Sequence, residues 1–430
     1  MTTARSTSAE ADANAEAGVN ANAAGADRRL ERMQRLEIGA LLGFAFVLPM
    51  LEAPKNLLWL AYAALWIAHR WRTRDFGGPW SGWDTLVAAW IASGYVVAAF
   101  AGLHHKEWDG ANDILRYGSM LWMVMRAGYP LPVLGRLLVA LFAGTALTMA
   151  WGAWGVLEGK RQLLGLRSVG HVNHSAIFLA IVFGTALAWV RAAWGTATIA
   201  HRVAGAGLCA LYGAGLIVMQ SRASVGAAFV AALVVLAAHA LRSRRGLHKI
   251  IIGSLALVAL LLAVRPNVIE KNEALLRQDM FLAYRDAIWR AGIEAWRAAP
   301  VFGVGMSNYG RIGYAQLEAW SAARGQAFDR NSVALSSHAH SLYVNTLAER
   351  GLVGLGVLLA VLAAWFWSLA RALPAATAPP LVWAYWGGAA FAWLVAVIVG
   401  FANTTLHSEH ALVSMLLLGG WLSISRARTR

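Results

Sequence analysis

Long runs of apolar residues dominate this sequence and limit the folds that it can adopt. They lie near residues 38–53, 56–71, 84–102, 113–127, 132–155, 172–193, 200–219, 223–241, 247–265, 351–370, 381–401 and 410–425, and the fourth is short. Crossing a bilayer takes a helix of roughly 17–25 residues. The chain is 59% hydrophobic and 14% charged, whereas soluble domains have about 45–50% and about 25%. The sequence therefore predicts an all-α, polytopic membrane protein with about twelve transmembrane helices.

The positive charge of the chain is distributed unevenly among the connections between these runs. A net charge of +15 in so apolar a chain favours orientation and contact with anionic membrane lipids over nucleic-acid binding. One alternating set of connections is rich in cations and holds Arg70, Arg72, Arg74, Arg126, Arg136, Arg191, Arg202, Arg242, Arg244, Arg245, Lys249, Arg371, Arg426, Arg428 and Arg430. By the positive-inside rule this set and both termini are predicted to be cytoplasmic.

The runs divide the chain into four predicted parts. A disordered cytoplasmic tail (1–36) precedes transmembrane helices 1–9 (37–265), an outward loop that contains helices (266–350) and transmembrane helices 10–12 (351–430). The first 27 residues contain almost no large apolar side chain, so they cannot bury enough surface to fold. The basic residues that follow lead into a run without a cleavage site, so no signal peptide is expected. The single cysteine, Cys209, lies in an apolar run and is expected to serve packing.

The outward loop is where we expect the chemistry, and its first part is helix-like up to Pro300. Arg285 precedes Trp289, Ile293 and Trp296 by four, eight and eleven residues, which places a guanidinium on the apolar face of that helix. A charge there needs a partner, either a bound anion or a carboxylate elsewhere in the loop. In contrast, Arg290, Glu294 and Arg297 have the spacing of a solvated ion-pair face.

Arg222 lies in the short turn VMQSRASVG between two apolar runs, at the predicted outer edge of the membrane. The sequence contains no Asp or Glu from residue 159 to residue 269. One interpretation is an interfacial arginine whose guanidinium reaches lipid phosphates. The other is a ligand site, because the planar guanidinium binds phosphate oxygens in a bidentate manner.

The outward loop ends in NSVALSSHAHSLYVNTLAERG, where Ser336 and Ser337 are predicted caps of the helix that enters the next run. His340 is then in the first turn of this helix. The positive end of the helix dipole and nearby arginines both disfavour imidazolium, so His340 is expected to be neutral and able to accept a proton. His338 is the reserve candidate, and a surface histidine without a role is the alternative for both.

Several motifs are absent from the sequence. It contains neither H-E-x-x-H nor a cysteine-rich ligand set, and neither a P-loop nor a G-x-G-x-x-G motif follows a strand pattern. We therefore expect no metal, nucleotide or other cofactor.

Three blocks of sequence resemble, in order and spacing, the C-terminal signature of the O-antigen ligase and O-antigen polymerase superfamily. They are Ser221-Arg222 at the start of a membrane helix, YRDAIWRAGIEAWRAAPVFGVGMSNYG, and HSLYVNTLAERGLVGL. The segment GHVNHSAIFLAI, at residues 170–181, is similar to the Asn-containing segment that begins a middle helix in that superfamily. This similarity adds Asn173 and His174 as secondary candidates. The resemblance covers residues 170–355 and departs from the family pattern at the extra His338 and at Ser341.

This resemblance implies a metal-independent, inverting glycosyltransferase of the bacterial inner membrane that acts on the periplasmic face. It would transfer polysaccharide from undecaprenyl diphosphate to an acceptor. Arg222 and Arg285 match the arginines that hold the lipid diphosphate in the family, and His340 matches its catalytic histidine. Within the superfamily we favour the ligase, whose acceptor is a lipid A-core oligosaccharide, because the polar material is gathered in one loop before His340.

Three further cations and two alternatives complete the prediction. Lys160, Arg161 and Arg167 in a smaller outward loop would contact phosphates of the acceptor or of membrane lipids. An O-antigen polymerase of the same superfamily is the first alternative. A secondary transporter for an anionic solute is the second, although such proteins place functional charges near the membrane midplane and show internal repeats.

Overall fold

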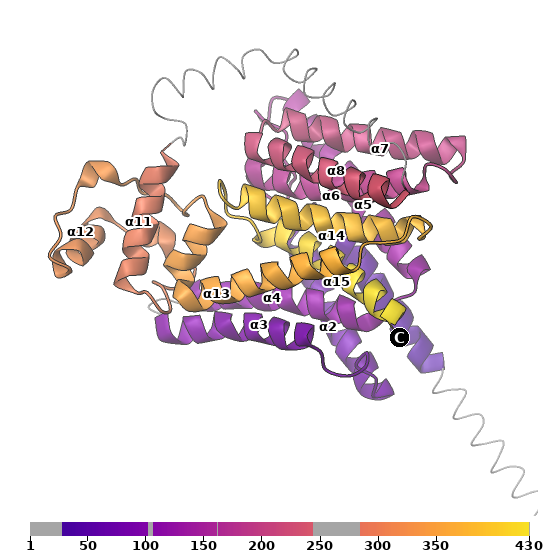
Figure 1. Cartoon of the computed structure of the whole chain (residues 1–430), viewed down its shortest axis with the longest axis horizontal. Helices are drawn as coiled ribbons and strands as arrows, with labels where there is room; N and C mark the ends of the chain where they lie inside the picture. The colour runs from indigo at the N-terminus through magenta and orange to yellow at the C-terminus, as the bar shows by residue number, and fades with distance from the viewer. Residues whose placement is uncertain (1–27, 102–105, 161, 244–283, 430) are drawn as a thin grey trace, which may run out of the picture.

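The computed structural model describes residues 28–101, 106–160, 162–243 and 284–429, and within these ranges it is helical without β-strands (Figure 1). The first helix covers residues 28–47. The others are α2 (Glu52–Thr73), α3 (Gly82–Ala101), α4 (Lys106–Ala127), α5 (Leu131–Leu157), α6 (Val172–Ala193), α7 (Ile199–Val218), α8 (Arg222–Ser243), α11 (Arg285–Ala298), α12 (Tyr314–Ala323), α13 (Leu342–Arg371), α14 (Pro380–Val399) and α15 (Ser408–Thr429), with 3-10 turns at Tyr309–Arg311 and Arg330–Ser332.

Among the described residues, seven helices are long and apolar enough to cross a membrane: α3, α5, α6, α7, α8, α13 and α14. The helix at residues 28–47 and helices α2, α4 and α15 coincide with four other predicted spans, but they are not among these seven. The predicted span at 247–265 lies outside the described residues. The all-α, polytopic architecture is therefore confirmed, and the count of twelve spans stays a prediction.

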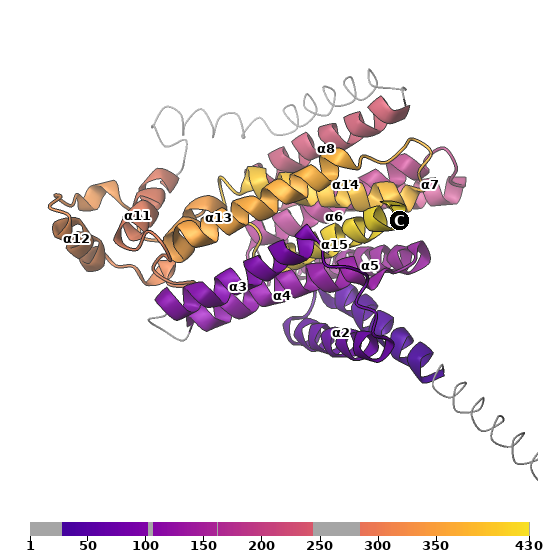
Figure 2. The same ribbon diagram turned by 60° about the horizontal axis from the view of Figure 1, so that its bottom comes forward.

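Helix α14 is the centre of the bundle, packed against α6, α8 and α15, while α15 packs against α4 and α4 against α3 (Figure 2). Small residues allow α6 and α14 to come close together. A Cβ atom added to Gly184 in α6 would lie 2.0 Å from the ring of Phe391 in α14. The close contact of these two helices fixes where the first turn of α6 lies relative to the loop that follows α14.

Beyond one end of the bundle, α11 and α12 form a small lobe that rests on the first half of α13 (Figure 1). The lobe has its own apolar core, made of Ala291, Ala295, Tyr309, Ile312, Leu317, Val333, Ala339 and Ala348. Because Ala348 belongs to α13, this core joins the lobe to the bundle.

The buried face of α11 differs from the predicted one. Its fully buried residues are Ala291, Gly292 and Ala295, whereas the stripe of large residues that follows Arg285 is only partly buried. Small side chains occupy the buried face because they let α11 approach α13 closely. A Cβ atom at Gly292 would lie 2.6 Å from Val344.

The ion pairs on the solvated face of α11 are partly as predicted. Arg297 lies 2.8 Å from Glu294, but Arg290 pairs with Asp286 at 3.6 Å, one turn earlier than expected. Glu294 also pairs with Arg324, a residue just after α12.

Residues 28–36, assigned above to a disordered tail, form the first turns of the first helix. Arg35 and Glu31 form an i,i+4 ion pair at 3.4 Å, and such pairs stabilise an exposed helix end. Residues 1–27 lie outside the described residues.

The segment before the lobe's first 3-10 turn is bound to a break in α13. Val304 N donates to Ala348 O and Gly305 N to Glu349 O, while Leu352 N donates to Pro300 O. Gly351 has φ 59° and ψ −159°, a region that is essentially restricted to glycine. The P-x-x-G-x-G and E-x-G blocks of the sequence are therefore one backbone junction, which sets the position of the lobe.

We predict that Gly351→Ala destabilises the protein by roughly 1–3 kcal/mol, because the residue would be strained and its Cβ would lie 2.3 Å from Val301 O. Thermal unfolding of the purified protein in detergent measures the effect. Gly356→Ala in the same helix is the control, because a Cβ there meets nothing within 4 Å. Equal melting temperatures for the two variants would contradict this role of the junction.

Candidate functional site

Histidines from three distant segments of the chain meet at one end of the bundle. His171 and His174 come from the start of α6, His338 and His340 from the residues before α13, and His407 and His410 from the start of α15. We call these six residues the histidine cluster. The ring centroid of His174 lies 5.2 Å from that of His410, 6.1 Å from His407, and 6.3 Å from both His171 and His338. His338 and His340 are 4.1 Å apart.

Arg285 and Arg222 lie beside this cluster. Arg285 is the first residue of α11, and its Nε donates to the carbonyl oxygen of Ala402 at 3.0 Å, in the loop between α14 and α15. The pKa of Arg285 is lowered by partial burial and by the charge of Arg222. The charge of Arg285 in turn helps to lower the pKa of His340. The structure thus brings together three residues that the sequence analysis selected from widely separated positions.

His340 lies just before α13, and its position differs from the predicted first turn. The N-cap is Ser341, whose hydroxyl accepts from Val344 N at 3.4 Å, rather than Ser336 or Ser337. His340 has a left-handed backbone, with φ 47°. Burial lowers the pKa of His340 to about 4, and His338, Arg285 and His171 contribute. The expectation of a neutral imidazole at physiological pH agrees with this environment.

His338 has a different environment from His340. Its Nδ1 lies 3.0 Å from Ser337 Oγ, and its Nε2 is buried. Burial lowers the pKa of His338, the charges of His407 and His171 lower it further, and a hydrogen bond with the Asn403 side chain raises it. A buried nitrogen of this kind is costly unless a hydrogen-bond partner meets it.

Several helices begin around the cluster. His171 caps α6, Arg222 begins α8, Arg285 begins α11 and Ser341 caps α13, and α15 begins at Ser408. The unpaired N–H groups and the dipole at a helix N-terminus favour an anion. Together with two arginines, these helix ends create a positive potential that suits a phosphate group.

The loop between α14 and α15 is held on both sides. Leu342 N donates to Gly400 O at 2.7 Å, and Ser341 Oγ donates to the same oxygen at 3.1 Å, which ties the start of α13 to the end of α14. Leu406 and Ser408 have positive φ angles of 54° and 47°. Strained residues of this kind persist only where the surroundings fix them.

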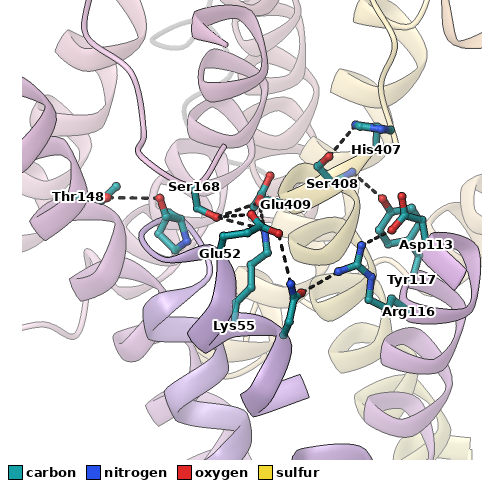
Figure 3. A network of polar contacts seen from close by, with 12 residues as sticks. Glu52, Lys55, Asp113, Arg116, Tyr117, Thr148, Ser168, His407, Ser408 and Glu409 are labelled. Carbon is teal, nitrogen blue, oxygen red and sulfur yellow. Dashed lines mark hydrogen bonds and ion pairs between the residues drawn. The ribbon is translucent and has the colours of Figure 1, made fainter. Parts of the chain in front are cut away.

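The first turn of α15 is anchored by a polar network with α2, α4 and the loop before α6 (Figure 3). Glu409 forms an ion pair with Lys55, and both side chains are almost completely buried. Ser168 Oγ donates to Glu409 at 3.0 Å, and Ser408 N donates to the hydroxyl of Tyr117 at 2.7 Å. Lys55 is thus a buried counter-ion of Glu409, the residue next to His410 in α15.

The remaining predicted site residues make contacts of their own. The backbone N of Asn173 donates to Nδ1 of His171 at 3.2 Å. Lys160 pairs with Glu158 at 2.7 Å, and Arg167 lies 4.1 Å from the ring centroid of Trp151. Both cations line a hollow of about 390 Å³ together with Trp151, Gly152, Trp154, Gly155 and Glu158, so the hollow's lining includes none of the clustered histidines. Arg161 lies outside the described residues.

Three members of the histidine cluster were not selected from the sequence: His171, His407 and His410. A signal was present, because His171 and His174, and again His407 and His410, have H-x-x-H spacing next to the start of an apolar run. Spacing of three places two side chains on one side of a helix start. That these two pairs meet depends on the packing of α6 with α14 and α15, which no local pattern reveals.

Comparison with known proteins agrees with the resemblance found in the sequence. Residues 207–359 match the family model described as O-antigen ligase. The chain is 31% identical over 259 residues to the exopolysaccharide production protein ExoQ of Rhizobium meliloti (strain 1021). This alignment covers 58% of the chain and 54% of that relative. The chain thus matches about half of the relative's length. These two matches support a relationship of the chain to the O-antigen ligase and polymerase superfamily.

Proposed function

We propose that the chain is an O-antigen ligase, which transfers polysaccharide from undecaprenyl diphosphate to a hydroxyl of a lipid A-core oligosaccharide. The family match supports a polysaccharide ligase or polymerase function in general. The observation that carries the proposal is the gathering of Arg222, Arg285 and His340 at one end of the bundle. The proposed location is the periplasmic face of the inner membrane, with both termini in the cytoplasm.

In this proposal Arg222 and Arg285 bind the diphosphate of the donor. The bond between the sugar and the diphosphate breaks with its electron pair on the phosphate oxygen, so the main task is to stabilise the negative charge that develops there. Two guanidinium groups and the surrounding helix N-termini supply this stabilisation. The donor already contains a good leaving group, so the reaction needs neither a nucleotide nor a catalytic metal.

His340 is the proposed general base. The acceptor hydroxyl oxygen attacks the anomeric carbon opposite the diphosphate, its proton passes to His340, and the configuration at that carbon inverts. A pKa of about 4 makes His340 a weak base in the donor-free protein. Because a bound anion favours imidazolium, the donor would raise this pKa toward the working pH. His338 is the reserve candidate for the same step.

The hollow beside α5 is a proposed contact for the acceptor. Trp151 and Trp154 offer flat apolar faces, and Lys160 and Arg167 offer charges that suit sugar phosphates. Membrane lipid headgroups would satisfy the same side chains, so the hollow supports the proposal less directly than the residues around His340 do.

Two alternatives differ from this proposal in distinct ways. A polymerase would use the same residues with a second lipid-linked glycan as acceptor, and the name of the matched relative, an exopolysaccharide production protein, keeps this alternative in view. An anion transporter would place its charges along a path near the membrane midplane. Here the residues in question gather at one end of the bundle, which supports a transferase.

Replacing His340 with Ala is expected to reduce transfer by about 10²–10⁴-fold, because the base is lost. The assay uses purified protein, a lipid-linked glycan, and either lipid A-core or a second lipid-linked glycan as acceptor, which separates ligase from polymerase. His201→Ala is the control, because His201 is exposed at the start of α7 and contacts Thr198. Full activity of the His340 variant would remove His340 from the catalytic role.

Arg285→Lys and Arg222→Lys should each retain only part of the affinity for the donor, because an ammonium cannot form the bidentate contact. Alanine at either position should weaken donor use further, by roughly 10–100-fold in kcat/KM for the loss of a charge-assisted contact. The matched control is Arg290→Lys, on the same helix as Arg285 but in an exposed pair with Asp286. An equal loss in the control would argue for a general effect on the lobe.

The acid limb of kcat/KM should lie near pH 4, since this quantity reports the free enzyme and the pKa of His340 there is about 4. Below that pH the imidazole is protonated and cannot act as a base. The limb of kcat should lie at higher pH, because the bound diphosphate raises the pKa. Two limbs that coincide at about 6.5, the ordinary value for histidine, would contradict the proposed environment of His340.

A further inference from the structure

Three members of the histidine cluster are arranged as metal ligands are. His174, His407 and His410 each offer one ring nitrogen, and these three atoms lie within 4.8 Å of one another. We propose that these three histidines form a binding site for Zn²⁺ or a similar nitrogen-preferring divalent metal. The proposed transfer reaction does not use this site, because its arginines and base act without a metal. The site departs from the expectation, based on sequence motifs, that the chain holds no metal.

The distances between the three side chains are close to those of a zinc site. Zn–N bonds of about 2.0–2.1 Å in tetrahedral geometry place ligand nitrogens about 3.3–3.4 Å apart. Nδ1 of His174 and Nε2 of His410 are 2.9 Å apart. The ring centroid of His407 lies 6.1 Å from that of His174 and 6.4 Å from that of His410. A metal ion bound by all three histidines therefore requires side-chain rotations that bring the three nitrogens, now within 4.8 Å of one another, to this spacing.

The tautomers show how the ion would enter. His407 N donates to Nδ1 of His410 at 3.3 Å, so the ring proton of His410 is on Nε2 and is shared with Nδ1 of His174. A divalent ion would take the place of this shared proton. The proton then moves to Nδ1 of His410, so the hydrogen bond to His174 and the one accepted from His407 N are both exchanged for two metal bonds.

His407 is oriented for the same role. Its Nδ1 lies 2.7 Å from Ser408 Oγ, which leaves Nε2 as the ligand atom. Hydrogen bonds to the second ring nitrogen are what orients histidine in metal sites. The backbone of Ser408 is itself held by Tyr117, and Glu409 by Lys55 (Figure 3). The ligands thus lie on two helices and on a loop whose position the network fixes.

The ligand types select the metal. Three neutral imidazoles suit zinc, nickel and copper, whereas Mg²⁺ and Ca²⁺ prefer oxygen ligands. Three ligands leave a fourth tetrahedral position open. A water molecule can take this position, as it does in zinc sites with three protein ligands.

The test uses the full-length protein, purified in detergent, treated with EDTA and then dialysed. Titration with ZnCl₂ in a calorimeter should give one ion per chain. A ligand that binds only the folded state also raises the melting temperature, so each protein is compared with and without ZnCl₂. His174→Gln, His407→Gln and His410→Gln should each weaken binding by at least about 10-fold, as the loss of a ligand or of its support does. MgCl₂ should have no effect.

The controls separate this proposal from a fold defect and from the proposed transfer function. His201→Gln lies outside the cluster and should bind zinc as the unaltered protein does. A variant that melts early without zinc is judged by its zinc-induced shift alone. Zinc binding that is absent, or that survives in all three variants, would overturn the proposal. Because binding is measured without donor or acceptor, a failed transfer assay leaves this result unchanged.

Discussion

The main physical constraint on this structure is the concentration of positive charge at one end of an apolar bundle. Helices α6, α8, α11, α13 and α15 begin around the histidine cluster, and Arg222 and Arg285 stand at the first residues of two of them. Electrostatics in a region of reduced dielectric makes such an arrangement unfavourable unless an anion binds or the histidines stay neutral. Burial, followed by the neighbouring charges, lowers the pKa of His340, and the same concentration of charge supports the proposed diphosphate site.

The contacts that position the charged residues are either uncharged backbone hydrogen bonds or closed ion pairs. The junction between residues 300–305 and the break at Gly351 fixes the lobe through backbone hydrogen bonds, without adding charge. On the other side of the cluster, the buried pair of Lys55 and Glu409 anchors α15. A buried charge that lost its partner would be costly.

Sequence analysis predicted the helical membrane architecture because long apolar runs have few other solutions. It also selected Arg222 and Arg285, because a charge next to apolar residues needs a partner. It selected His340 because a neutral histidine in the loop can accept a proton. It failed where packing decides. The buried face of α11 consists of Ala291, Gly292 and Ala295 rather than the large residues, and Ser341, not an earlier serine, caps α13. His407 and His410 follow a short turn. Their contact with His174 depends on the packing of the whole bundle.

The most direct measurement is the affinity of the purified protein for undecaprenyl diphosphate that carries no sugar. The account predicts that a double variant, Arg222→Ala with Arg285→Ala, binds this lipid at least about 10-fold more weakly, since charge-assisted contacts are lost. A protein with His340→Ala should bind it as the unaltered protein does, because the base acts on the acceptor. Equal affinity in the arginine variant would contradict the account.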